Sequence, residues 1–183
     1  MFNMKNNKIN YEGRKYEVVP HNPEWSVTFE KESQELKEIF GGDAIEVEHI
    51  GSTSIPNLDS KPTIDILIIA DNITITDQHI AEMKSHGYKY LGEYVMPDSR
   101  LFVKEREEKA DRLFNVHIFP KGHKHIKEMI GLRDYFRDHP EEVEKYAKLK
   151  KELATKYPDD YGQYRKFKDE YVEDLKKRVL DPD

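Results

Sequence analysis

One acidic side chain stands out because it interrupts an apolar segment. Asp65 lies within residues 64–70, where every other residue is isoleucine, leucine or alanine. A carboxylate in a buried strand is costly unless it is hydrogen-bonded, paired with a cation or bound to a metal ion. Gly51 and Ser52 lie where the preceding predicted strand ends, and twelve residues separate Ser52 from Asp65. We therefore expect the loop and this carboxylate to form a binding site.

The loop at residues 51–54 combines one glycine with three hydroxyl side chains. Gly51 allows close approach of the backbone to a ligand and a positive φ angle. Backbone N–H groups in such a turn, together with Ser52 and Ser54, can hold phosphate oxygens. The glycine and lysine spacing does not match a Walker P-loop. A small polar turn without a binding role is the alternative interpretation.

A carboxylate opposite a phosphate-binding turn suits a magnesium–nucleotide complex, because the metal ion bridges carboxylate and phosphate oxygens. Asn115 and His117 share one face of a predicted strand at residues 112–119. If that strand neighbours Asp65, His117 can serve as a metal ligand, as a proton carrier or as a hydrogen-bond donor to a phosphate. The alternatives are an Asp65 that caps a turn or pairs with Lys61 or an arginine, and an ordinary hydrogen-bonded histidine.

Several basic residues are candidates for neutralising the phosphates of a ligand. Four of them lie on or beside the predicted strands, and the fifth lies on a later helix, where an ion pair with Asp134 is an equally good interpretation. These residues are Lys61, Arg100, Lys104, Arg112 and Arg133.

Predicted helices and strands follow one another along the chain and would position these residues. Hydrophobic spacing predicts a helix at 23–40, a short helix at 77–86 and three C-terminal helices at 123–137, 140–157 and 164–179. Strands are predicted at 16–19, 44–50, 64–70, 88–94, 100–106 and 112–119. This order indicates an α+β fold, with a mixed β-sheet covered by helices and a C-terminal helical part. We expect a flexible lead-in at residues 1–15 and one domain at 16–183, divided into a sheet-containing part at 16–122 and a helical part at 123–183.

Composition narrows the class of protein. The 183 residues include 30 Lys and Arg against 36 Asp and Glu, and the net charge of −6 makes nucleic acid an unlikely partner. The absence of cysteine excludes disulfides, thiolate zinc sites and cysteine nucleophiles. The polar N-terminus lacks a signal peptide and no apolar run approaches the length of a membrane span. We therefore expect a cytoplasmic protein without a membrane partner.

The sequence resembles the GrpB family from about Val18 to its end. The matching segments are Val47-Glu-His-Ile-Gly-Ser-Thr-Ser-Ile-Pro, Lys61-Pro-Thr-Ile-Asp-Ile, Phe102-Val-Lys, Asn115-Val-His-Ile and Leu132-Arg-Asp-Tyr-Phe-Arg-Asp-His-Pro. The resemblance implies a nucleotidyltransferase-like fold with a nucleotide or other phosphorylated ligand at Gly51, Ser52 and Asp65. In some relatives of this family the domain is fused to dephospho-CoA kinase.

One position departs from the pattern of active nucleotidyltransferases, which carry a second carboxylate two residues after the first. Leu67 occupies that position here. Three hypotheses remain open. The first is Mg²⁺-dependent nucleotidyl transfer from an NTP to an unknown acceptor, with Asp65 as metal ligand and His117 as metal ligand or base. The second is a nucleotide-binding module without turnover. The third is a metal-dependent hydrolase that uses His49, Asp65 and His117.

Overall fold

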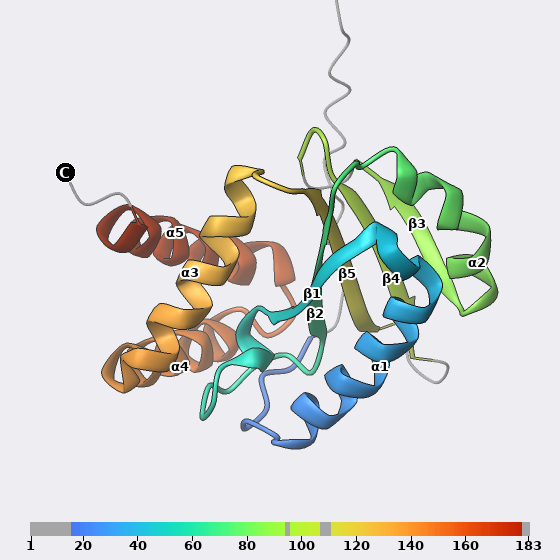
Figure 1. Ribbon diagram of the computed structural model, residues 1–183. Helices are drawn as coiled ribbons and strands as arrows, with labels where there is room; N and C mark the ends of the chain where they lie inside the picture. Colours follow the sequence, from blue (N-terminus) through green and yellow to red (C-terminus); the bar gives the residue numbers. More distant parts are fainter. Residues whose placement is uncertain (1–15, 94–95, 107–110, 181–183) are drawn as a thin grey trace, which may run out of the picture.

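The strands form one mixed sheet in a computed structural model that describes residues 16–93, 96–106 and 111–180 (Figure 1). Within these residues, five strands lie in the order β1-β2-β5-β4-β3. Their bounds are β1 Ala44–Ile50, β2 Ile64–Ala70, β3 Tyr88–Gly92, β4 Arg100–Glu105 and β5 Arg112–Pro120. β2 and β5 are parallel, and the other neighbours are antiparallel. The polar residues of β2 and β5 are therefore brought together at the centre of the sheet.

Helices cover both faces of the sheet (Figure 1). The first group is α1 (Glu24–Phe40) and α2 (Ile80–Ser85), drawn in blue and green. The second group is α3 (Lys124–Asp138), α4 (Pro140–Lys156) and α5 (Tyr161–Leu180), drawn in orange to red. The C-terminal helices thus lie on the side of the sheet opposite α1.

Alternation along the central strands assigns each residue to one of these two sides. The first core, below α1 and α2, includes Ile66 and Val116, which are fully buried. The second core contains Leu67 and Phe119 of the opposite face, packed against Met129 of α3. Burial of both faces explains why the central strands are almost continuously apolar.

The predicted α+β class with a mixed sheet and a C-terminal helical part is confirmed. The extended segment predicted at 16–19 forms only an isolated bridge, between Val19 and Ser60. The helix predicted at 77–86 begins earlier as a 3₁₀ turn, Ile75–His79, before α2. The predicted lead-in at 1–15 lies outside the described residues. No helix of the described part of the chain is long and apolar enough to cross a membrane.

Candidate functional site

The loop after β1 lies directly against Asp65. Gly51 has φ 71°, and a Cβ atom at this position would lie 2.6 Å from Asp65 Oδ2. Only glycine therefore fits both the backbone conformation and the space beside the carboxylate. Ser52–Ser54 forms a 3₁₀ turn, in which the Ser54 hydroxyl donates to the Gly51 carbonyl at 2.6 Å. Ser54 is thus occupied within the loop. Ser52 and Thr53 line a cavity. The Thr53 hydroxyl also contacts His49 and donates to the Thr63 carbonyl.

Asp65 belongs to a polar network across two parallel strands. Asn115 is its partner in the β2–β5 register and donates its Nδ2 to Asp65 Oδ1 at 2.7 Å. Arg112 donates to the Asn115 Oδ1 at 3.1 Å, which fixes the orientation of the amide. His117 Nε2 lies 3.6 Å from Asp65 Oδ1. Burial alone would raise the pKa of Asp65, but the contacts with His117 and Asn115 hold that pKa below its usual value.

A cavity of about 280 Å³ opens over this network, between the sheet and the C-terminal helices. The sheet side contributes the loop, Lys61, Arg112 and the Asp65 network. The helical side contributes residues that the sequence analysis did not select. These are Lys150, Tyr161, Tyr164, Arg165, Lys168 and Asp169.

The residues from α5 follow one helical stripe. Tyr161, Tyr164, Arg165 and Lys168 have the i, i+3, i+4, i+7 spacing that places side chains on a single face. Lys168 Nζ lies 2.7 Å from Asp169 Oδ1. Burial would lower the pKa of Lys168, but the neighbouring Tyr146 and Asp169 outweigh burial and raise it, so Lys168 is a cation at neutral pH. This i, i+3, i+4, i+7 spacing is visible in the sequence and could have indicated the helical side of the cavity.

Two of the predicted phosphate-binding residues face the other side of the sheet. Arg100 pairs with Ile118 and Lys104 with Phe114 in the β4–β5 register, and both partners belong to the core below α1. Arg100 Nε lies 2.7 Å from Asp77 Oδ1. Lys104 Nζ lies 2.9 Å from Glu32 Oε1. The expectation that these cations flank the pocket is corrected, because alternation along β4 points them away from Asp65.

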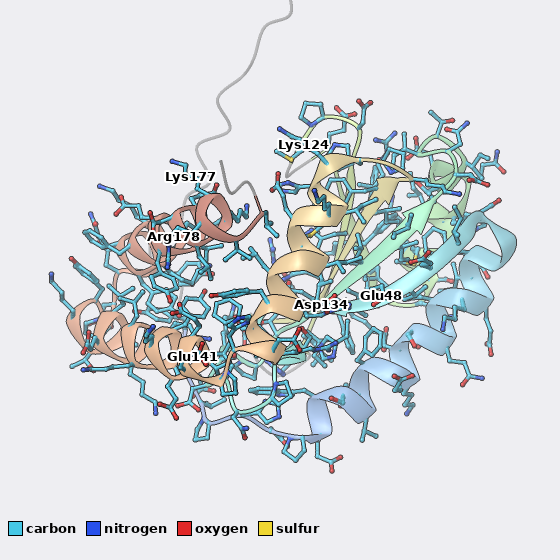
Figure 2. All side chains as sticks on the ribbon, turned by 60° about the vertical axis from the view of Figure 1, so that its left-hand side comes forward. Glu48, Lys124, Asp134, Glu141, Lys177 and Arg178 are labelled. Atoms are coloured by element: carbon cyan, nitrogen blue, oxygen red, sulfur yellow. The ribbon has the colours of Figure 1, made fainter. Side chains whose placement is uncertain are left out.

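The predicted cation on α3 also lies outside this cavity. Arg133 Nη1 contacts Glu48 Oε2 at 2.6 Å and donates to the His49 carbonyl, and its Nε contacts Asp134 Oδ1 at 2.8 Å. Figure 2 labels the two carboxylates, Glu48 on β1 and Asp134 on α3. Arg133 therefore joins α3 to the edge of the sheet and does not reach Asp65.

The residues proposed for a metal hydrolase do not form a metal centre. His49 Nε2 lies 3.0 Å from Thr53 Oγ1, and its ring stacks on Phe29. Among the described residues, no group of three or more His, Asp or Glu side chains could hold a metal ion. Leu67, at the position of the second carboxylate, is 0% exposed within the second core. On β2, Asp65 therefore faces the cavity without a second carboxylate at position 67.

The fold is nucleotidyltransferase-like. The structure is similar to Cid1, a poly(U) polymerase, in its complex with the short product ApU: the TM-score is 0.51 and the identity 19%, over 75% of this chain and 43% of that chain. At this level of identity the likeness concerns the fold alone.

The chain belongs to the GrpB family. The family model described as GrpB protein matches residues 15–178. The crystal structure of the conserved protein GrpB from Enterococcus faecalis is similar, with a TM-score of 0.84 and 36% identity over 90% of this chain and 98% of that chain. The UPF0157 protein YqkA of Bacillus subtilis is 40% identical over 88% of this chain. The chain spans 46% of the length of that relative.

Proposed function

We propose that the cavity binds a nucleotide or another phosphorylated small molecule. The observation that supports this proposal is the charge of the lining: within the described residues, five basic side chains face the cavity against two carboxylates, Asp65 and Asp169. The five are Lys61, Arg112, Lys150, Arg165 and Lys168. A small cavity with this charge favours a ligand that carries several negative charges.

Each wall of the cavity has a role in this proposal. Ser52 and the loop backbone would hold phosphate oxygens beside Asp65. Lys168 and Arg165, on the opposite helix, would neutralise the same phosphate chain. The aromatic rings of Tyr161 and Tyr164 would contact the organic part of the ligand. A nucleotide therefore matches the lining better than inorganic phosphate does.

The donor set fits one Mg²⁺ ion but not a two-metal centre. Mg²⁺ is commonly held by one or two carboxylates together with substrate phosphates, and Asp65 supplies one carboxylate. Asp65 would hold the ion, which would contribute positive charge on the phosphates. His117 is less suited to Mg²⁺, because this ion prefers oxygen ligands. We assign His117 instead the role of holding Asp65 or moving a proton.

Nucleotidyl transfer from an NTP to an unknown acceptor is the second candidate function. It is favoured by the contact between the Gly51 turn and Asp65, because a phosphate on the turn would lie beside the carboxylate. The buried Leu67 favours binding without turnover, because two-metal phosphoryl transfer needs further carboxylates.

Calorimetric titration with the four ribonucleoside triphosphates, with and without Mg²⁺, tests the proposal. We expect saturable binding, weakened about tenfold or more by Lys168→Met, since a charge-assisted hydrogen bond is worth about 1.5–3 kcal/mol. The matched control is Lys177→Met on the exposed face of the same helix (Figure 2). Absence of binding by every nucleotide, and also by pyrophosphate and inorganic phosphate, would overturn the proposal.

Release of pyrophosphate separates the two candidates. Turnover that disappears in Asp65→Asn supports nucleotidyl transfer, whereas binding without turnover supports the binding module. Turnover that survives in Asp65→Asn would remove Asp65 from the chemistry.

A further inference from the structure

One basic residue of the cavity differs from the others in its partners. Lys150 on α4 is 2% exposed, although its side chain lines the cavity. Its Nζ donates to Ser60 Oγ at 3.2 Å, and the Ser60 hydroxyl in turn donates to the Leu58 carbonyl. This neutral hydroxyl offers no opposite charge for an ammonium group.

The remaining groups around Lys150 do not supply that charge either. Asp59 forms its ion pair with Lys151, the exposed neighbour of Lys150 in sequence. The Tyr146 ring lies 4.7 Å from the Lys150 Nζ and favours a cation only modestly. Lys168 on α5 adds a positive charge. Within the described residues, Lys150 has no carboxylate within ion-pair distance, so its ammonium form is unfavourable in the empty cavity.

Three other basic side chains of the cavity, Lys61, Arg165 and Lys168, have carboxylate partners. Lys61 Nζ lies 3.3 Å from Asp111 Oδ1, and Arg165 Nε lies 3.0 Å from Asp169 Oδ2. Each of these two cations therefore has a carboxylate at ion-pair distance. Burial, together with the charge of Lys168, lowers the pKa of Lys150 to about 7, while Asp59 opposes the shift.

We propose that Lys150 forms a proton-linked subsite for a dianionic phosphate group, and that this amine takes up a proton when the phosphate enters the cavity. The inference rests on the proposed function and adds the chemistry of one subsite to it. A proton from solvent joins the neutral Nζ, and the resulting ammonium pairs with the phosphate dianion; no bond of the ligand is broken. A terminal phosphomonoester, with two charges, is favoured over a singly charged phosphodiester.

The pH dependence follows from this exchange. Above pH 7 the empty protein has a neutral Lys150, and binding must recruit a proton that becomes scarcer as the pH rises. Below pH 7 the amine is already protonated, and binding gains the ion pair without proton uptake. A phosphomonoester loses its second proton near pH 6, so affinity should be highest between about pH 6 and pH 7 and fall from pH 7 to pH 9. Lys150→Met should bind about tenfold more weakly at pH 6 and show a smaller loss at pH 9.

Lysine side-chain NMR on selectively labelled protein tests the proposal directly, with Lys150→Met to assign the signal. We expect Lys150 to titrate near pH 7 without ligand and at least one pH unit higher with saturating ATP in EDTA. Lys151, whose side chain is 64% exposed, is the internal control. A free-protein midpoint above pH 9.5 for Lys150 would overturn the proposal without any ligand.

Calorimetry in buffers with different enthalpies of ionisation measures the number of protons taken up when the ligand binds. At pH 7.5 we expect the wild-type protein to take up more protons per ATP bound than Lys150→Met. Ionisation of ATP itself contributes equally to both proteins, so it does not affect the difference between them. Binding of ATP with equal proton uptake in both proteins overturns the subsite and leaves the proposed function standing. If neither ATP, pyrophosphate nor phosphate binds or shifts the Lys150 signal, both proposals fail.

Discussion

The two faces of the sheet use the same strands for different purposes. In β2, Ile66 points into the dry core below α1, whereas Asp65, its neighbour, points into the cavity. In β5, Val116 and His117 divide in the same way. In these two central strands, the face below α1 is apolar, whereas the other face is apolar under α3 and polar under α4 and α5. Alternation along a strand thus separates residues that stabilise the fold from residues that can bind a ligand.

The largest expected effect tests this separation. Ile66→Ala should lower the free energy of unfolding by about 2–5 kcal/mol, because it opens a cavity in a fully buried core. Urea denaturation measures the loss. The matched change on the cavity face, His117→Ala, should cost less than about 1 kcal/mol and weaken nucleotide binding instead. Similar destabilisation by the two substitutions would contradict the division of roles.

The assignment of residues to faces was predictable from sequence, because isoleucine alternates with other residues along 64–68 and the period of two is a local property. Which of the basic residues face the cavity was not predictable from the sequence. Arg100 and Lys104 face away from Asp65, and deciding this requires the register of β4 against β5, which depends on contacts distant in sequence.

The helical wall of the cavity was missed for a different reason. Lys150 falls within the apolar stripe formed by Val143, Tyr146 and Leu153 on α4, and a lysine at such a position is unusual. No lysine of the C-terminal helices was predicted as a site residue. Helical periodicity shows which residues share a face, but not that this face closes over the polar end of the sheet. The predicted magnesium ion, acceptor and cellular location stay predictions.

A buried histidine provides a second test of the difference between the faces. His49 is 7% exposed; burial, with Arg137 and Arg133 nearby, lowers its pKa to about 4 against the contribution of Asp65. The unfolded chain therefore binds more protons than the folded one between pH 6.5 and pH 4, and stability falls as the pH falls through this window. The expected loss from His49 is roughly 3 kcal/mol.

Urea denaturation at intervals from pH 7 to pH 4.5 measures this loss. His49→Phe keeps an aromatic ring against Phe29 and removes the titrating group. The variant should be less sensitive to acid than the wild type, even if the lost contact with Thr53 lowers its stability at pH 7. An identical slope in both proteins would show that His49 is protonated equally in the folded and unfolded states.

A substitution beside Asp65 sharpens the comparison at the cavity itself. Asn115→Asp places a second carboxylate beside Asp65, at the contact now made by an amide donor at 2.7 Å. Two carboxylates this close cannot both ionise freely, so we expect a loss of about 1–2 kcal/mol at pH 7 and a smaller loss at pH 5. A divalent cation would relieve the repulsion, so Mg²⁺ should raise the thermal midpoint of this variant more than that of the wild type. Asn115→Ala removes the same hydrogen bond without adding charge and should not respond to Mg²⁺. If Asn115→Asp is equally insensitive to Mg²⁺, the polar end of the sheet lacks the geometry for a metal ion, and the basic side chains of α4 and α5 carry phosphate binding without one.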